Sequence, residues 1–416
     1  MFRHPSLLRL GGAFVLAIAC VAVAVAQTVP SAGTPNAAAP TTSAAAGRRG
    51  GGRGGRGGPP SPFAAKPPSV PMTKTFIDYF LPMPADKLSK TVWGAAQVGA
   101  RDPNNGLEDP TVSQWYYWDG QIIKAKDGTY HMFSSRWDQS HGHGGWGNSV
   151  AVHSVSTSGV SGPYIDKGMT WPDDLGGKGH NVTALVLPDD QGYAVVVSET
   201  RPTPAVFESK SLDGPWVNKG TIQGVQNSNI SIMVRPDGDF EIVPRNGHVY
   251  ISKKADGILG PYKDMTNGSI FPVGQQYPNM EDPCVFYAGG YYQVIVNSWS
   301  TRKAYHLTSK DGINNWVNRG LAYSPISDFV KYTDGSVNHW AIMERPGVLV
   351  EDGHVTHVTL ASINVPKASD HGNDNNGSKI LVLPFDGAKC DAELAKDYAA
   401  EDAAAAVPQP APTTKP

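Results

Sequence analysis

Cysteine and net charge are both scarce in this chain. It has three cysteines among 416 residues, and Cys20 lies in an N-terminal segment that we predict to be removed. Only Cys284 and Cys390 then remain, which excludes a disulfide framework and leaves one optional bridge. The 35 basic and 37 acidic side chains nearly cancel, so an attraction to nucleic acid has little support. We therefore expect an apolar core to hold the fold together.

Long apolar runs are also missing beyond the N-terminus. Arg3 and Arg9 precede a single apolar run, which ends in Ala24-Val25-Ala26. This arrangement is typical of a secretory signal peptide over residues 1–26. No later run is long enough to span a bilayer. We predict a secreted or periplasmic protein without a membrane span, cleaved near Ala26.

Segments of low complexity flank the middle of the chain. Residues 27–72 are rich in Ala, Pro, Gly and Arg, and residues 391–416 are rich in Ala and Pro, so neither can bury a core. We predict a disordered linker and a disordered tail. Residues 73–114 form an N-terminal arm with weak helical periodicity, which would cap the repeats or join two copies into a homodimer.

The middle of the chain contains an internal repeat. A turn followed by an apolar or aromatic strand occurs five times, and its glycines are 64, 46, 52 and 63 residues apart. The five copies begin at Asp127-Gly128, Gln191-Gly192, Asp237-Gly238, Gly289-Gly290 and Asp352-Gly353. A second motif falls between them, as Gly162-Pro163-Tyr164, Gly214-Pro215-Trp216, Gly260-Pro261-Tyr262 and Asn314-Asn315-Trp316. Such turns between β-branched or aromatic runs are typical of β-hairpins.

The repeat predicts the fold class. A period of about 50 residues fits four strands per propeller blade. We predict an all-β, five-bladed β-propeller over residues 115–390. A β-sandwich is the rival architecture, but it would not explain two interleaved motifs.

Polar residues precede each turn motif at a similar distance. Counting back nine residues from the turn glycine, or eight in the fourth unit, leads to an acidic or amide side chain in four units, and the longer second unit offers a histidine and an asparagine. The set is Asp119, His180, Asn181, Asn229, Glu281, Asp282 and Glu344. Because the first strand of a propeller blade starts beside the central axis, we expect these side chains to meet at the channel mouth.

Several carboxylates in one small volume favour a catalytic site. Like charges in a confined site raise one another's pKa values, which a purely structural ring does not need. Glycoside hydrolysis requires one carboxylate as base or nucleophile and a second acidic group that is protonated. Taken singly, Asp119, Asp282 or Glu344 is more simply a turn residue that accepts backbone hydrogen bonds. Their shared register favours the catalytic interpretation.

Three short motifs carry a resemblance to known enzymes. They are Trp118-Asp119-Gly120, Met280-Glu281-Asp282-Pro283 and Met343-Glu344-Arg345-Pro346, in the first, fourth and fifth units. Their order resembles the five-bladed propeller glycoside hydrolases of the family 43, 32 and 117 superfamily. Family 43 has two acids in blades two and three, where this chain has His180, Asn181 and Asn229. The layout is therefore more similar to family 117.

The resemblance implies an exo-acting, inverting hydrolase that removes a terminal sugar of the 3,6-anhydro-galactose, galactose or arabinose type. It implies Asp119 as general base and Asp282 as the group that orients substrate or tunes the acid. Glu344 is the first candidate for the general acid and His339 the alternative, while Glu281 could exchange roles with Asp282. No cofactor is required, although the resemblance also implies a calcium or similar ion in the axial channel.

Aromatic and basic side chains near these acids predict sugar binding. Sugar rings stack on indole rings, and their hydroxyls need polar partners. The residues that we expect to bind substrate are Trp118, His180, Asn181, Asn229, Arg302, Trp340 and Arg345. His141 and His143 lie in a glycine-rich loop without a ligand framework at zinc spacing, so we expect them at the substrate or in solvent rather than on a metal.

Two other functions remain open. A polysaccharide lyase acting on uronate-containing glycans would use His180 or His339 as base and Arg345 to neutralise the uronate. A non-catalytic glycan-binding propeller would use the aromatic residues but not the acids. In each case the partner is an oligosaccharide or a polysaccharide.

Overall fold

Short turns and apolar strands alternate along the chain in a computed structural model, which describes residues 60–84, 104–199, 204–374 and 376–406. The repeated turn motifs close hairpins, as where Asp127-Gly128 links β1 (Trp115–Lys124) to β2 (Tyr130–Asp138). The predicted signal peptide and the predicted linker up to residue 59 lie outside the described residues. Within those residues, no helix is long and apolar enough to cross a membrane.

The described strands form five antiparallel sheets, each made of consecutive strands. Blade 1 contains β1, β2, β3 (Val150–Ser156) and β4 (Ile165–Met169). Blade 2 contains β5 (Val182–Val186), β6 (Tyr193–Val197), β7 (Ala205–Ser209) and β8 (Val217–Thr221). Blade 3 contains β9 (Ser231–Val234), β10 (Phe240–Val243), β11 (Tyr250–Ser252) and β12 (Lys263–Asp264). Blade 4 contains β13 (Met280–Ala288), β14 (Tyr291–Ser298), β15 (Lys303–Ser309) and β16 (Val317–Tyr323). Blade 5 contains β17 (Ile342–Glu351), β18 (His354–Ile363) and β19 (Ser378–Pro384).

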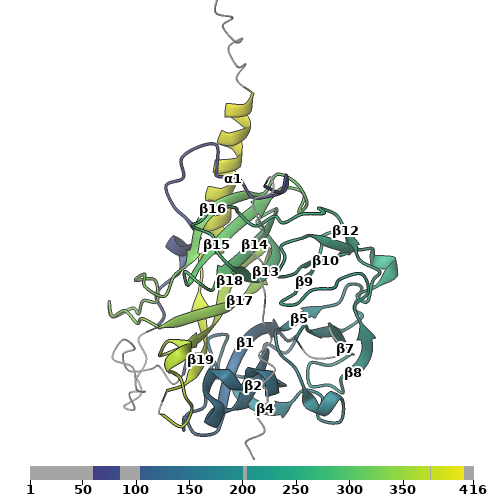
Figure 1. Cartoon of the computed structure of the whole chain (residues 1–416), viewed down its shortest axis with the longest axis vertical. Helices are drawn as coiled ribbons and strands as arrows, with labels where there is room; N and C mark the ends of the chain where they lie inside the picture. Colours follow the sequence, from purple (N-terminus) through teal and green to yellow (C-terminus); the bar gives the residue numbers. More distant parts are fainter. Residues whose placement is uncertain (1–59, 85–103, 200–203, 375, 407–416) are drawn as a thin grey trace, which may run out of the picture. The chain divides into compact units, whose positions relative to one another are not determined.

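The first strand of each blade lies innermost. β1, β5, β9, β13 and β17 contact one another in that order and β17 returns to β1, so the five sheets close into a ring. Figure 1 shows these strands near the centre, with β4, β8 and β12 further out. The predicted all-β, five-bladed propeller is confirmed.

The segment before β1 joins the outer edge of blade 5. The N–H of Leu107 donates to the carbonyl of Ile380 over 3.0 Å, and the N–H of Ile380 donates to Leu107 over 2.9 Å. The Asn105 side chain donates to the carbonyl of Val382 over 2.8 Å and accepts from its N–H over 3.1 Å. This end of the predicted helical arm is therefore extended chain that fastens the first blade to the last, while residues 85–103 lie outside the described residues.

Aromatic side chains fill the space between blades. Trp171, which follows β4, stacks on Phe207 of blade 2 with ring centroids 3.7 Å apart. Trp216 of the second repeat motif meets Phe133 edge-on at 5.1 Å, and Trp316 of the same motif is 1% exposed. Trp216 and Trp316, the tryptophans of the repeat, are therefore packing residues.

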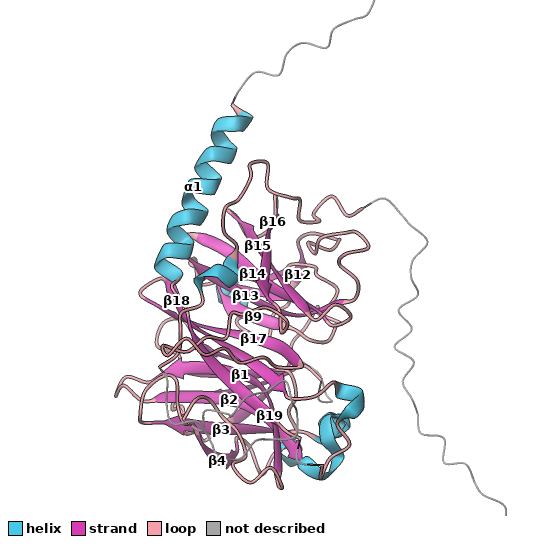
Figure 2. Cartoon of the chain, turned by 90° about the vertical axis from the view of Figure 1, so that its left-hand side faces the viewer, coloured by secondary structure: helices cyan, strands magenta, loops and turns pink. Residues whose placement is uncertain are grey.

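The tail prediction is wrong for residues 391–405, because helix α1 (Gly387–Ala405) covers them. Cys390, Leu394 and Tyr398 recur every four residues and form its buried face. Tyr398 stacks on Tyr291 of blade 4 with centroids 4.5 Å apart, and Figure 2 shows α1 beside β18. Alanine content was interpreted as low complexity, whereas alanine is the strongest helix former and a buried stripe holds the helix in place.

The end of the predicted linker is also ordered. The N–H of Ala65 donates to the carbonyl of Ile270 over 2.9 Å, and that of Lys66 donates to Trp316 over 3.0 Å. These bonds fasten the segment to blades 3 and 4, so the prediction of disorder is wrong for residues 60–72. In residues 73–84 the predicted helical character is limited to one 3₁₀ turn, η1 (Phe76–Tyr79).

Candidate active site

Each blade places one residue in the left-handed region of backbone space at or just before its first strand. The residues are Asp119, Asn181, Asn229, Asp282 and Arg345, with φ of 66°, 54°, 49°, 53° and 51°. Positive φ is uncommon outside glycine, although asparagine and aspartate tolerate it. In blades 1, 4 and 5 the strand register also shifts at this point, as in a β-bulge. The five blades thus share one local turn.

Hydrogen bonds connect these five side chains across the blade boundaries. Asn181 Nδ2 donates to Asn229 Oδ1 over 2.8 Å, and Asn229 Nδ2 donates to Asp282 Oδ1 over 2.6 Å. Arg345 donates from Nη1 to Asp282 over 3.3 Å and from Nε to Asp119 over 2.9 Å. The backbone N–H of Val182, the residue after Asn181, donates to Asp119 Oδ2 over 3.2 Å, so the hydrogen bonds form a closed ring. We call these five residues the axial ring.

The axial ring corrects the predicted alignment of the fifth blade. Sequence spacing assigned Glu344 to this position, but Arg345 occupies it. Arg345 lies eight residues before its turn glycine, as Asp282 does, so the count of nine was wrong by one residue. A shift of one residue along a strand moves a side chain to the opposite face of the sheet. Glu344 is therefore equivalent to Glu281, and both line a pocket next to the ring.

This pocket has a volume of about 190 Å³ and draws residues from all five blades. Four residues of the axial ring contribute to its wall, and the others are mainly charged or aromatic. The lining residues are Trp118, His143, Trp146, His180, Asn181, Glu199, Asn229, Arg245, Glu281, Asp282, Glu344, Arg345 and Lys367. Of the predicted substrate-binding residues, Trp118, His180, Asn181, Asn229 and Arg345 thus meet at one site.

Glu344 is held by two cations at this site. Arg302 Nη1 lies 2.6 Å from its Oε1 and Lys367 Nζ lies 2.5 Å from its Oε2. The Glu344 side chain is 2% exposed, whereas those of Arg302 and Lys367 are 30% and 27% exposed. The predicted residue Arg302 therefore reaches the site through Glu344.

Glu281 is the acid whose ionisation the site perturbs most clearly. Burial is the main cause and repulsion from Asp282 adds to it, so that the pKa of Glu281 rises to about 8 although Arg245 opposes the shift. Arg245 Nη2 lies 2.5 Å from Glu281 Oε2. Since its pKa lies above 7, Glu281 is mostly protonated at neutral pH and can donate a proton.

The acids also form the kind of group that binds divalent cations. Glu281, Asp282 and Glu344 each offer a carboxylate oxygen within 4.8 Å of the others. Protein cations already contact all three, however, with Arg345 on Asp282 at 3.3 Å in addition to the pairs described above. A metal ion would have to displace them, so the group fits internal charge compensation better. The predicted calcium in the axial channel stays a prediction.

Aromatic rings form one wall of the pocket. The segment η2 (Gln139–Asn148) carries His143 and Trp146 over it. Trp146 is 43% exposed, and its ring centroid lies 5.2 Å from that of His180. Burial lowers the pKa of His143 to about 2, so this loop histidine is neutral and faces the pocket rather than solvent. An exposed indole beside buried polar groups is the arrangement that a sugar face requires.

Four predicted residues lie outside the pocket lining, namely Asp119, Arg302, His339 and Trp340. Asp119 and Arg302 each contact a lining residue, Arg345 and Glu344 respectively. His339 is 41% exposed, and its Nε2 lies 2.6 Å from Asp328 Oδ1. Trp340 is 3% exposed and belongs to an apolar core cluster with Met343. Both precede β17 in irregular chain, where neither a period of two nor a turn count predicts the direction of a side chain.

The sequence interpretation missed Glu199, Arg245 and Lys367, which all lie after the second strand of a blade. In an antiparallel hairpin the end of the second strand lies beside the start of the first. The N–H of Arg245 accordingly donates to Ser228 over 3.0 Å, directly before the ring residue Asn229. Charged residues just beyond each second strand were the signal that could have found them.

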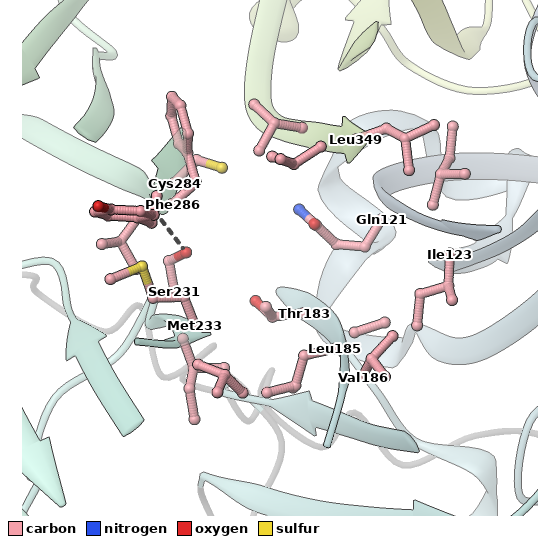
Figure 3. A pocket seen from close by; sticks show the side chains of 18 of the residues that line it. Gln121, Ile123, Thr183, Leu185, Val186, Ser231, Met233, Cys284, Phe286 and Leu349 are labelled. Atoms are coloured by element: carbon pink, nitrogen blue, oxygen red, sulfur yellow. Dashed lines mark hydrogen bonds between the residues drawn. The ribbon is translucent and has the colours of Figure 1, made fainter. Parts of the chain in front are cut away.

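A wider cavity of about 700 Å³ opens on the other side of the axial ring. Figure 3 shows the side chains two and four residues beyond the ring turning into it. They include Gln121, Ile123, Thr183, Leu185, Ser231, Met233, Cys284, Phe286 and Leu349. Cys284 is a free thiol, as is Cys390, so the optional bridge is not formed. The cavity wall mixes apolar and polar side chains, and its acids, Glu351 and Asp352, are neighbours in sequence at the end of blade 5's first strand.

Comparison with known proteins reveals remote similarity in structure only. No protein-family model matches the sequence, and no curated protein matches it. A thermostable family-43 glycoside hydrolase aligns over 66% of this chain and 93% of its own, with 14% identity and a TM-score of 0.45. The catalytic domain of the Coprinopsis cinerea GH62 α-L-arabinofuranosidase aligns over 70% and 98%, with 13% identity and a TM-score of 0.49. A family 117 glycoside hydrolase of the marine bacterium Zobellia galactanivorans aligns over 68% and 88%, with 14% identity and a TM-score of 0.47.

Proposed function

We propose that the protein is an exported glycoside hydrolase that removes one terminal sugar from a polysaccharide-derived oligosaccharide. The observation that carries the proposal is Glu281, whose pKa of about 8 keeps it protonated at neutral pH in a pocket lined by further acids and an exposed indole. Cleavage of a glycosidic bond needs such a proton donor at the leaving oxygen. Glu281 takes this role in place of Glu344 and His339.

Asp119 is the general base of the proposed mechanism. It belongs to blade 1, whereas Glu281 belongs to blade 4, so the two acids approach the site from blades that are not neighbours. Arg345, Ser135 and one backbone N–H donate to Asp119. A carboxylate has about four acceptor positions, so one is left for the attacking water. That water must enter from the pocket, because Asp119 is 1% exposed and does not itself line the pocket. Base and acid on opposite sides of the sugar correspond to inversion at the anomeric carbon.

The remaining acids tune the proton donor. Asp282 raises the pKa of Glu281 most strongly after burial, and Glu344 contributes in the same direction. Arg345 holds Asp119 and Asp282 in one guanidinium fork, so base and tuning group keep a fixed separation. Arg345 thus compensates the charge of the base, while the neighbouring acids favour the protonated form of Glu281.

The size of the pocket supports removal of a single sugar. Pockets for drug-sized ligands usually measure about 300–1,000 Å³, and this one measures about 190 Å³. Such a volume suits one sugar ring, with Trp146 at the mouth available for the next. The proposed sugar is of the 3,6-anhydro-galactose, galactose or arabinose type, and a signal peptide ending near Ala26 would deliver the enzyme to it.

The test is an activity screen of the signal-free protein on plant and algal oligosaccharides, with products identified by mass. Asp119→Asn and Glu281→Gln should each lower kcat by about 10²–10⁴-fold while the variants still bind oligosaccharide. Glu351→Gln, on the far side of the axial ring, is the matched control and should retain activity. Unchanged turnover in both site variants would disprove the assignment.

One observation favours a polysaccharide lyase as the second candidate. His180 is buried in the pocket, burial lowers its pKa, and its Nδ1 has no hydrogen-bond partner among the described residues. A neutral histidine near Arg245 and Lys367 could take a proton from a uronate whose carboxylate the cations neutralise. This function predicts an unsaturated product that absorbs in the ultraviolet, which hydrolysis does not form.

A further inference from the structure

A second group of ionisable side chains lies away from the pocket, where blade 1 meets blade 2. It consists of His131 on β2, His153 on β3 and Asp213 in the turn after β7, and one ligand atom of each lies within 4.8 Å of the others. We propose that these three residues bind a divalent transition-metal ion of the Zn²⁺ type. The site is independent of the proposed hydrolysis.

The two histidines lie on the same face of one sheet. His131 Nδ1 and His153 Nε2 are 2.8 Å apart, and the ring centroids are 4.9 Å apart with planes inclined by 16°. With the nitrogens so close, this centroid separation means that the rings meet edge to edge rather than face to face. Both side chains are buried, at 5% and 7% exposed. Two imidazole nitrogens therefore converge on one point inside the protein.

A neighbouring hydrogen-bond chain fixes which nitrogen of His131 is free to bind. The Thr129 hydroxyl donates to Asp127 Oδ1 over 2.6 Å, and the same oxygen lies 3.1 Å from His131 Nε2. Since the hydroxyl proton is already used, Thr129 must accept from His131 Nε2–H, which leaves the lone pair on Nδ1. A hydrogen-bond partner that fixes the tautomer in this way is typical of histidines that bind metal ions.

Asp213 supplies the third ligand from the next blade. Its Oδ1 lies 4.0 Å from His131 Nδ1, and its side chain is 74% exposed, so it can swing towards the two rings. Zinc bonds of about 2.0–2.1 Å to nitrogen and oxygen in a tetrahedron separate neighbouring ligand atoms by roughly 3.3 Å. The rings must move apart slightly, and the carboxylate must move closer. Solvent at the exposed side provides the fourth ligand.

The donor set selects the type of ion. Two imidazoles and one carboxylate suit Zn²⁺, Ni²⁺ or Cu²⁺ better than Ca²⁺ or Mg²⁺, which prefer oxygen ligands. A bound ion would replace the proton now shared between the two histidines and would tie the β7–β8 turn of blade 2 to the sheet of blade 1. Its expected role is to fasten two adjacent blades.

The test is equilibrium dialysis of the chelator-treated full chain against Zn²⁺. We expect one zinc per chain, and a loss of at least tenfold in affinity in His131→Gln and His153→Gln. His248→Gln is the matched control, because His248 also pairs with an aspartate, Asp264, at 2.7 Å but belongs to no group of three metal-ligating side chains within the described part of the chain. It should bind zinc as the unchanged protein does.

A second measurement uses the unchanged protein, so its result does not depend on whether the variants fold. X-ray absorption at the zinc edge of the unchanged protein should reveal two imidazole ligands, with oxygen completing the shell. The proposal is overturned if no zinc binds, if the ligand shell lacks two imidazoles, or if binding survives His153→Gln. Binding lost in Glu281→Gln but kept in His153→Gln would place the ion in the pocket and also overturn it.

Discussion

Arg345 binds Asp119 through Nε at 2.9 Å and thereby joins blade 5 to blade 1 at the centre of the propeller. Its Nη1 reaches Asp282 of blade 4 at 3.3 Å, so one guanidinium compensates two carboxylates that are 1% and 4% exposed. Buried carboxylates are costly unless they are paired. The axial ring is thus both the floor of the pocket and the electrostatic link between three blades.

Replacing Arg345 should destabilise the fold. Arg345→Met leaves two buried carboxylates unpaired, and breaking a buried ion pair costs about 3–5 kcal/mol of unfolding free energy. Urea denaturation followed by tryptophan fluorescence measures the loss. Arg302→Met is the matched control, because Arg302 is 30% exposed and its partner Glu344 keeps Lys367. Equal losses in the two variants would contradict the role of the axial ring.

The activity should decline above about pH 8 because Glu281 must be protonated to act. We expect a basic limb in kcat/KM near that pH, and a loss of about 10²–10⁴-fold in kcat for Glu281→Gln. Glu241→Gln is a stringent control, since burial also raises the pKa of Glu241 to about 8 but this residue pairs with Arg235 outside the pocket. A basic limb that moves in Glu241→Gln and not in Glu281→Gln would refute the assignment.

Glu281 should also make stability depend on pH. Its pKa is about 8 in the folded chain against a reference value of 4.5, so the folded state binds this proton more tightly than the unfolded state. This contribution to the free energy of unfolding is complete below pH 4.5 and is lost as pH rises to about 8. Glu281→Gln should flatten that part of the stability profile in denaturant titrations. An unchanged profile would mean that Glu281 titrates normally.

Trp146 should contribute to substrate binding rather than to chemistry. Trp146→Ala removes an exposed stacking surface, which we expect to raise KM by roughly tenfold with little change in kcat. Trp299→Ala is the control, because Trp299 is 40% exposed, close to the 43% of Trp146, but does not line the pocket. Steady-state kinetics with the oligosaccharide identified in the activity screen gives KM and kcat for Trp146→Ala and Trp299→Ala. A similar KM in both variants would exclude stacking at Trp146.

Helix α1 should contribute to the stability of the propeller. Leu394 is 4% exposed, and a buried Leu→Ala change costs about 2–5 kcal/mol. Leu394→Ala should lower the unfolding free energy by that amount, whereas Ala395→Ser on the exposed part of the helix should have little effect. If Leu394→Ala had no effect, the tail would be dispensable, as its composition first indicated.

The repeat predicted the fold because its physical signals are local. The Asp-Gly pairs at Asp127 and Asp352 close hairpins by the conformational freedom of glycine, and the apolar runs beside them identify buried strands. Tertiary packing decided the parts that were missed. Helix α1 depends on a buried stripe formed by Cys390, Leu394 and Tyr398, of which Tyr398 stacks on Tyr291 of blade 4. Alanine content alone does not reveal such a stripe.

The sequence predicted the site in outline, but it placed the ring residue of the fifth blade one position too early. Counting from turns identified Asp119 and Asp282, because a count of nine fits the five-residue turn of blade 1 and a count of eight fits the two-residue turn of blade 4. Blade 5 has a two-residue turn like that of blade 4, so counting nine residues back from its glycine selected Glu344 instead of Arg345, whereas the β-bulge is common to blades 1, 4 and 5. Glu199 was missed because it lines the pocket from the segment after the second strand of blade 2, where no sequence motif marks it.

The most direct test of the account is to run the reaction in ¹⁸O-enriched water and to determine the mass and anomeric configuration of the first product by mass spectrometry and proton NMR. Hydrolysis with Asp119 as base and Glu281 as acid predicts one solvent oxygen on the anomeric carbon and inverted configuration, both lost with activity in Glu281→Gln. A product without solvent oxygen that absorbs in the ultraviolet would contradict hydrolysis, and a retained configuration would contradict Asp119 as the base.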